Sequence, residues 1–256
     1  MKHQILTVML ASAVAANPIA ILRKREVPQE HSHRNVILAV NTLLQQNNPD
    51  NIQDAVFGLL GAAAAKNGAG SIADADCLQQ ATADQAFTNA KAAGDVDGMT
   101  SALIFRALER NTGSVGLASV ACTSIQAVNP EVAAIQQHQD PAGDGAQASN
   151  KQIAEELARQ IASVGGDPTL ANEASTFAPG QIGDPTAKGN TCDDDQDDNG
   201  CINTLGLRVD DLTAAEIQAA IQGVSAGADG QGNAGNNTGN GAGNSTQIAN
   251  SGCGGA

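Results

Sequence analysis

The segment 192–201, CDDDQDDNGC, holds the residues whose types and spacing are best suited to chemistry. It contains alternating Asp and Asn side chains followed by Gly200, which fits the calcium-loop pattern D-x-[DN]-x-[DN]-G. Calcium ions take about six to eight oxygen ligands, and alternating Asp and Asn side chains supply several of them from one turn. The candidate Ca²⁺ ligands are Asp195, Asp197, Asn199 and Asn203.

The pattern is similar to the first half of an EF-hand-type loop. Position twelve of such a loop needs a bidentate Glu or an Asp, and here it is Gly206. Without this ligand, the expected affinity for Ca²⁺ is weak, of about millimolar order. The alternative is an exposed turn whose carboxylates stay hydrated and whose ends are joined by a disulfide. We favour this alternative, and no other cofactor is expected.

Among the four histidines, His31 and His33 are the other candidate metal ligands. His31 and His33 could chelate a transition metal together, but two ligands near a chain end make a weak site. We therefore favour a surface role for both. His138 opens the segment 138–147, whose sequence predicts an exposed loop.

No set of side chains predicts catalysis. The carboxylates of Glu155 and Glu156 are neighbours in sequence, as are those of Asp210 and Asp211, so they should point apart. Glycoside hydrolysis needs opposed carboxylates, and the chain has no Trp or Tyr to stack on sugars. We therefore expect no enzymatic activity and assign no catalytic residue.

The chain has five cysteines, which in a secreted protein are by default cross-linked. We favour the pairs Cys77–Cys122 and Cys192–Cys201, because each pair stays within one compositional block. Other connectivities stay open, since spacing alone does not fix them. Cys253 is left over in this scheme and could join two chains as a dimer.

Apolar residues at helical spacing predict the elements that position these side chains. The expected helices are 34–46, 51–66, 71–91, 94–113, 115–128, a short helix capped by Asn129 with Pro130 at its first position, 149–164 and 212–222.

Capping signals support the last two of these helices. Ser149 and Gln152 have the spacing of a capping box, as do Thr213 and Glu216. The predicted fold class is therefore all-α: an Ala-rich helical bundle stabilised by disulfides over residues 26–222. Within it, residues 175–211 form a turn-rich acidic subregion.

The N-terminus indicates secretion. Residues 1–16 include a short apolar run that ends in small residues, as in a signal peptide, and about a dozen apolar residues are too few to span a bilayer. Residues 17–25 are interpreted as a pro-segment, because Lys24 and Arg25 resemble the kexin-type processing sites of fungal secretory pathways. A plain basic surface turn is an equal alternative.

The charge balance is strongly acidic. The formal net charge is −14, and removal of the first 25 residues, which hold four of the basic side chains, brings it to −18. Such a surface opposes binding to nucleic acids and to anionic membranes. We expect neither a nucleic-acid partner nor membrane insertion.

Residues 223–256 are rich in Gly, Asn, Ala and Ser and hold a single charge. A segment of this composition buries too little apolar surface to offset its ordering entropy, so we expect a disordered tail. Asn236 and Asn244 lie in glycosylation sequons. A flexible glycosylated extension suits a spacer at a cell surface.

A leader, a dibasic processing site, an Ala-rich helical domain and a Gly/Asn-rich tail occur together in this chain. The layout resembles small secreted or cell-wall-associated surface proteins of filamentous fungi, a broad class that implies no particular functional residues. It implies an extracellular or wall-associated structural or interaction protein, with the wall matrix or an extracellular protein as partner. One alternative is a secreted effector acting on a host or competitor. The other is a weak extracellular Ca²⁺-binding module.

Overall fold

The computed structural model describes residues 30–226, which are helical and contain no strand. The nearest feature to a sheet within this range is one isolated antiparallel bridge between Phe177 and Arg208. The α-helices are α1 Arg34–Leu44, α2 Ala62–Ala65, α3 Leu78–Ala93, α4 Val96–Ala107, α5 Pro130–Ala133, α6 Ala146–Ser163, α7 Cys201–Thr204 and α8 Ala214–Ala220. Three short 3₁₀ helices span Ala55–Leu59, Ala75–Cys77 and Pro168–Ala174.

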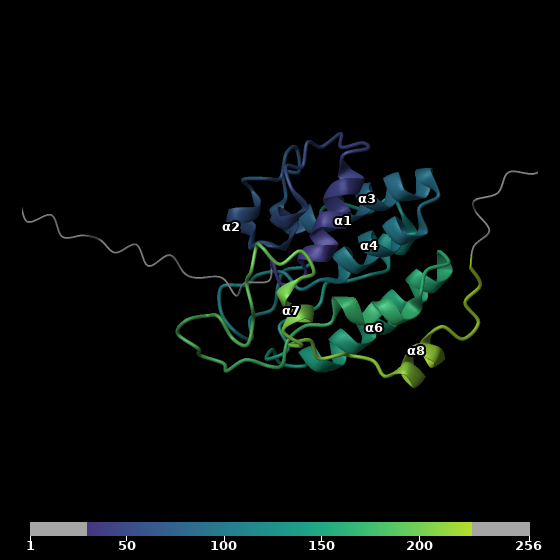
Figure 1. Ribbon diagram of the computed structural model, residues 1–256. Coiled ribbons are helices and arrows are strands. Elements are labelled where there is room, and N and C mark those ends of the chain that lie inside the picture. Colours follow the sequence, from purple (N-terminus) through teal and green to yellow (C-terminus); the bar gives the residue numbers. More distant parts are fainter. Residues whose placement is uncertain (1–29, 227–256) are drawn as a thin grey trace, which may run out of the picture.

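The long helices form two groups that meet along α4. Helices α1, α3 and α4 pack on one another, and α6 packs on α4 and on the 3₁₀ helix Pro168–Ala174. Helix α8 lies on the outer side of α6, and the turn-rich segment with α7 runs along one flank (Figure 1). The predicted all-α class is therefore confirmed for the described residues.

Small side chains allow the close helix packing. The largest apolar side chains that are fully buried are Phe87 on α3 and Phe105 on α4. Alanines fill the remaining contacts, and because each buries little area the core depends on many of them. Fully buried alanines on α3, α4 and α6 include Ala83, Ala86, Ala90, Ala102, Ala107, Ala154 and Ala158.

The structure contains the two favoured disulfides, Cys77–Cys122 and Cys192–Cys201. The first joins the start of α3 to the segment 115–128, and the second closes the acidic segment at the start of α7. Both disulfides therefore fasten irregular chain to the helical core.

The predicted helix over 51–66 is wrong. This stretch contains only the 3₁₀ helix Ala55–Leu59 and the four-residue α2. Asn51 has a positive φ of 54°, which starts a turn rather than a helix. At Gly58 an added Cβ would lie 3.1 Å from the Cα of Gln79 and 3.1 Å from Cζ of Phe105, so the backbone passes unusually close to α3 and α4. Tertiary contact thus overrides the apolar periodicity.

The predicted helix over 115–128 is also wrong, since this segment has no regular secondary structure. Its carbonyl groups accept hydrogen bonds from side chains of the core instead. Arg110 and Gln137 donate to the carbonyl oxygen of Val120 at 3.0 and 2.9 Å, and Gln80 donates to that of Ile125 at 2.8 Å. These long-range bonds replace the local ladder of a helix.

The buried side chain of Arg106 stabilises the same segment indirectly, through two glutamines. Arg106 on α4 is 1% exposed, and within residues 30–226 it has no ion pair with a carboxylate. Its guanidinium donates to the side-chain oxygens of Gln137 at 3.2 Å and Gln80 at 3.4 Å. Burial lowers the pKa of Arg106 to about 10, and the nearby positive charge of Arg110 contributes. The same two glutamines hold the 115–128 segment, so the cation orders their amide groups.

Three predicted helices have ends that differ clearly from the expectation. The helix predicted over 71–91 begins only at Leu78, after the 3₁₀ helix Ala75–Cys77, because Asp74 caps that 3₁₀ helix through the backbone N–H of Asp76. The helix predicted over 94–113 ends at Ala107, because Leu108 is already extended and Arg110 turns back to bond the carbonyl oxygen of Asp76. Helix α6 begins at Ala146, three residues before the proposed cap, and the hydroxyl of Ser149 donates to the carbonyl oxygen of Ala146. The capping box assigned to Ser149 is therefore wrong.

Two other capping predictions are confirmed. Thr213 and Glu216 form the expected capping box at the start of α8. Asn129 occupies the N-cap of α5 and is followed by Pro130. Both depend on residues within four positions of each other, so local spacing suffices to predict them.

Within residues 30–226, no helix combines the length and the apolar character needed to cross a bilayer. Several sequence predictions lie outside the described residues. These are the signal peptide, the pro-segment with Lys24 and Arg25, the sequons at Asn236 and Asn244, and Cys253.

Candidate metal centre

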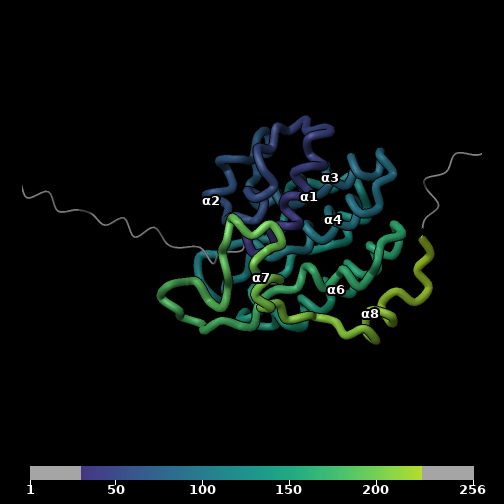
Figure 2. Tube along the Cα trace, in the orientation of Figure 1, coloured from purple at the N-terminus to yellow at the C-terminus, as the bar shows by residue number. Residues whose placement is uncertain are grey.

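The turn before α1 and the acidic segment 192–201 lie side by side, although about 160 residues separate them (Figure 2). The backbone N–H of Ile202 donates to the carbonyl oxygen of Ser32 at 3.3 Å. Nε of Arg34 donates to Oδ1 of Asp198 at 2.9 Å, which joins α1 to the acidic segment. The tertiary fold therefore places acidic side chains next to the first helix.

Gly200 makes this approach possible. Its φ is +82°, and an added Cβ would lie only 2.6 Å from the carbonyl oxygen of Ser32 and 3.2 Å from the backbone nitrogen of Arg34. A side chain here would strain the backbone and collide with the chain before α1. The glycine of the proposed calcium loop thus serves a close packing contact.

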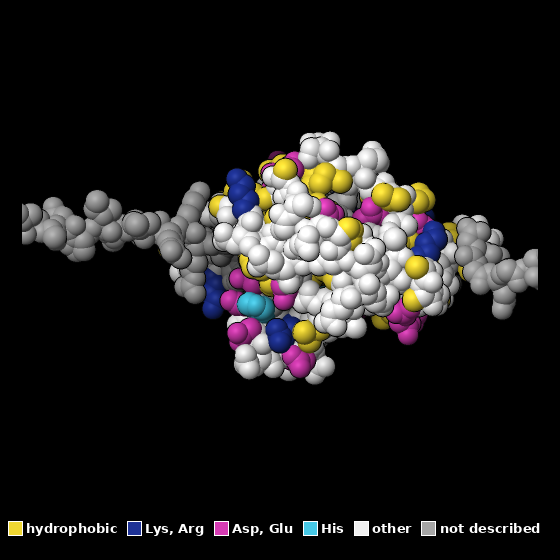
Figure 3. Space-filling model, turned by 90° about the horizontal axis from the view of Figure 1, so that it is seen from above, with side chains coloured by type: hydrophobic (Ala, Val, Ile, Leu, Met, Phe, Trp, Pro, Cys, Tyr) yellow, Lys and Arg dark blue, Asp and Glu magenta, His cyan; other side chains and the backbone are white. Residues whose placement is uncertain are grey.

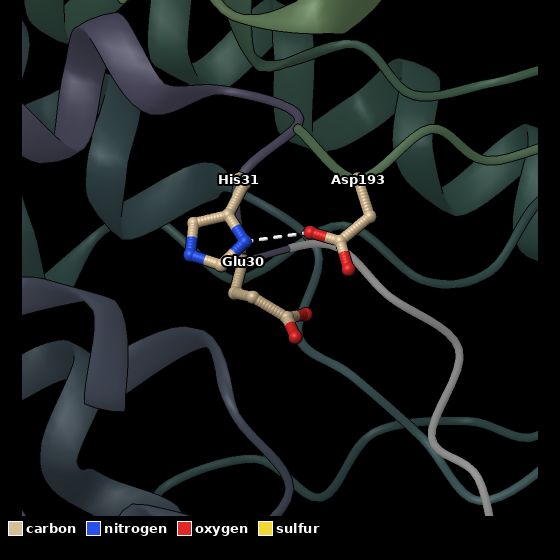
Figure 4. A group of neighbouring side chains, drawn as sticks. All are labelled: Glu30, His31 and Asp193. Atoms are coloured by element: carbon tan, nitrogen blue, oxygen red, sulfur yellow. Dashed lines mark hydrogen bonds and ion pairs between the residues drawn. The ribbon is translucent and has the colours of Figure 1, made fainter. Parts of the chain in front are cut away.

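Glu30, His31 and Asp193 come together at this contact (Figure 4). The Nδ1 atom of His31 lies 2.6 Å from Oδ1 of Asp193, and one carboxylate oxygen of Glu30 lies within 4.8 Å of both ligand atoms. Nδ2 of Asn111 donates to Oε2 of Glu30 at 2.5 Å. Among residues 30–226 this is the only group of three His, Cys, Asp or Glu side chains close enough to share a metal ion.

The surroundings of this group are acidic. The face drawn in Figure 3 carries several Asp and Glu side chains, and the side chains of His31 and Asp193 are 28% and 40% exposed. The pKa of Asp195 is lowered, first by a hydrogen bond from the amide of Gln196 and further by the charges of His31 and Arg34. The carboxylate of Asp195 therefore keeps its negative charge to a lower pH than a free carboxylate and contributes to the attraction of cations to this surface.

Three of the four candidate Ca²⁺ ligands, Asp195, Asp197 and Asn203, accept hydrogen bonds from other groups of the chain. Asp195 accepts from the Nε2 of Gln196 at 3.0 Å, and Asp197 accepts from the backbone N–H of Asn199 at 3.1 Å. The Oδ1 atom of Asn203 accepts from the guanidinium of Arg208 at 3.0 Å. The guanidinium of Arg208 therefore already contacts the oxygen that Asn203 would offer to Ca²⁺. Binding of Ca²⁺ through these four residues stays a prediction.

The surface roles predicted for His33 and His138 are wrong. Both side chains are buried and are held by distant backbone carbonyls: Nε2 of His33 lies 3.2 Å from the carbonyl oxygen of Ser175, and Nδ1 of His138 lies 2.6 Å from that of Ala107. The other ring nitrogen of His138 pairs with Asp211 at 3.1 Å. His31 and His33 therefore face different surroundings and do not form the proposed chelating pair.

The two pairs of carboxylates that are neighbours in sequence, 155 with 156 and 210 with 211, have different partners in the structure. Asp210 and Asp211 point apart, as expected, to Arg208 at 2.8 Å and to His138. Burial raises the pKa of Asp211, but hydrogen bonding and the charge of His138 outweigh it, so the pKa lies below its usual value. Glu155 and Glu156 both pair with Arg159, through Nη2 at 3.6 Å and Nη1 at 2.8 Å respectively.

The burial of His33 makes stability depend on pH. Burial is the main cause that lowers its pKa from the usual 6.5 to about 4. The folded state therefore binds this proton less well than the unfolded state, and stability is lost as pH falls from about 6.5 to about 4. We expect the free energy of unfolding to be about 3 kcal/mol lower at pH 4 than at pH 8 from this side chain alone.

The measurement is urea unfolding of the wild type and of His33→Gln across this pH range. The variant lacks the titrating ring, so its curve should be flatter than that of the wild type by about this amount. Parallel curves would show that His33 is not the acid-sensitive group.

The close approach at Gly200 gives a second prediction. Gly200→Ala should destabilise the protein by about 3 kcal/mol or more, since it combines a strained φ with a collision against backbone. Gly206→Ala is the matched control, because Gly206 also has a positive φ of 62° but open space around it. That variant should cost about 1–2 kcal/mol. Equal losses in thermal unfolding would contradict the contact.

The sequence reasoning considered His31 as a ligand but missed Glu30 and Asp193. The signal was present in part, because the favoured disulfide Cys192–Cys201 pins an acidic segment at the N-terminus of α7. The sequence did not show which residues the acidic segment contacts in the folded protein. Only the folded chain brings residues 193 and 31 together.

Comparison with known protein families, with curated proteins and with solved structures finds no match for this chain. The described residues themselves define it as a disulfide-bonded all-α domain. Its most concentrated group of potential ligands is Glu30, His31 and Asp193.

Proposed function

We propose that this chain is a secreted, non-enzymatic structural or interaction protein of the cell surface or cell-wall matrix. The observation that carries the proposal is the pair of intramolecular disulfides. Disulfides form and persist in oxidising compartments, and both of these fasten surface segments that have little regular structure of their own. This use of cysteine fits the leader expected at residues 1–16 and the processing expected after Arg25.

The roles of the ionisable side chains also support an interaction protein. His33 and His138 are used in buried hydrogen bonds, and Asp211 pairs with His138. Four of the five acidic residues of the 192–201 segment are exposed and Asp197 is half-buried; two of the exposed ones contact α1 and the preceding turn. Such a surface suits a cationic partner in the wall matrix or an extracellular protein.

The test is fractionation of the native organism's culture into medium, washed wall and cytosol, followed by non-reducing intact-mass analysis. The proposal expects the protein in the wall fraction, starting at Glu26, with a mass that reports at least two disulfides. Protein found in the medium and absent from the wall would favour the secreted effector instead. Cytosolic protein with its leader intact and all thiols free would overturn the proposal.

A further inference from the structure

We propose that Glu30, His31 and Asp193 form a binding site for a divalent transition metal, for which Zn²⁺ is the best match. The site differs from the Ca²⁺ loop suggested by the sequence, because it uses neither Asp195 nor Asp197. It also stands independently of the proposed extracellular role, since it follows from the contact between the turn before α1 and the acidic segment.

The first argument is geometric. Zinc is bound by imidazole nitrogen and carboxylate oxygen at about 2.0–2.2 Å, so two ligand atoms of a tetrahedral site are about 3.3 Å apart. The three side chains each offer one ligand atom, and these atoms all lie within 4.8 Å of one another; Nδ1 of His31 and Oδ1 of Asp193 are 2.6 Å apart. That pair has to open by about 0.7 Å, and both side chains are partly exposed, at 28% and 40%.

The second argument concerns direction. In Figure 4 the carboxylates of Glu30 and Asp193 lie on the Nδ1 side of the His31 ring, while the other ring nitrogen points away from both. One nitrogen and two oxygens thus converge from two chain segments. Three protein ligands leave a coordination position open for water or for a partner's side chain.

The third argument is that Glu30 is held in place. Its carboxylate accepts from Nδ2 of Asn111, a residue that is 4% exposed and whose backbone N–H is bound to the carbonyl oxygen of Leu59 at 2.8 Å. A hydrogen-bonded neighbour that orients a ligating carboxylate typically strengthens metal binding about 10–100-fold. The buried Asn111 supplies such support from outside the turn that carries the ligands.

The ligand set decides the class of metal. An imidazole with two carboxylates suits Zn²⁺ and related divalent transition ions, whereas Ca²⁺ prefers a larger number of oxygen ligands. A bound ion would join residues 31 and 193, which are 162 positions apart, and would reinforce the contact made at Gly200. Zinc binding should therefore stabilise the folded chain.

The experiment uses the intact purified protein, with any free thiol alkylated so that sulfur does not compete for the metal. Zinc chloride is titrated in calorimetry and in an NMR experiment that follows the imidazole signals. We expect binding of one Zn²⁺, a rise in melting temperature and a shift of the His31 signals. The signals of the buried His33 and His138 serve as an internal control and should not move.

His31→Ala and Asp193→Asn should each weaken Zn²⁺ binding at least about tenfold. Asp198→Asn is the matched control, because Asp198 lies in the same segment but pairs with Arg34, and it should bind Zn²⁺ nearly as the wild type does. The melting temperature of each metal-free variant checks that it folds. Two results would overturn the site: no binding at a Zn²⁺ concentration of about 0.1 mM, or the same affinity for Zn²⁺ in all three variants.

Discussion

Replacing both Cys77 and Cys122 with alanine is expected to lower the free energy of unfolding by about 4 kcal/mol. This disulfide closes a loop of 45 residues and therefore restricts the unfolded chain strongly. The same replacement at Cys192 and Cys201, which are nine residues apart, should cost only about 2.5 kcal/mol. The two double variants are matched controls for each other.

Urea unfolding measures both losses, and adding reductant provides a further check. In reductant the wild type should lose the stability contributed by both bridges and fall below either double variant measured without reductant. A greater loss at Cys192 and Cys201 than at Cys77 and Cys122 would contradict the loop-length argument. The 115–128 segment should also become more accessible to proteases when Cys122 is released, because its remaining tethers are side-chain hydrogen bonds.

Phe105→Ala is expected to destabilise the protein by about 3–5 kcal/mol, the usual cost of removing a fully buried aromatic ring. Its Cζ lies 3.1 Å from the point where Gly58 would carry a Cβ, so the ring fills the space between α4 and the 3₁₀ helix Ala55–Leu59. The chain has only four Phe and no Trp or Tyr. Few other large side chains are available to close the cavity.

The control for this prediction is Val128→Ala, since Val128 is 84% exposed. That variant should stay within about 0.5 kcal/mol of the wild type. Thermal and urea unfolding of both variants measure the difference. A loss below about 1 kcal/mol for Phe105→Ala would mean that the ring is not an essential part of the core.

Features that depend on neighbouring residues could be predicted from the sequence. The apolar stripe of α1 and the capping box of Thr213 with Glu216 are examples, because a helix repeats every few residues and its caps act within one turn. The favoured disulfide pairs also matched, since each joins cysteines of one compositional block. The all-α class follows from the sum of such local signals.

Features that depend on residues far apart in the chain could not be predicted from the sequence. The segment 115–128 has apolar residues at helical spacing. Its carbonyl oxygens nevertheless accept hydrogen bonds from the side chains of Arg110, Gln80 and Gln137, which lie outside the segment. The same applies to His33, whose buried ring is hydrogen-bonded to the carbonyl oxygen of Ser175, 142 positions away. The spacing of apolar residues along the chain does not show which distant side chain or carbonyl group will form a hydrogen bond with a given residue.

The candidate metal centre combines both kinds of information. The sequence by itself determined that this chain contains an acidic segment bounded by two cysteines and a pair of histidines. Only the tertiary structure decided that Asp193 meets Glu30 and His31, while His33 turns inward and Asn203 meets Arg208. The physical reason is the close approach at Gly200, a contact between backbones that no side-chain spacing encodes.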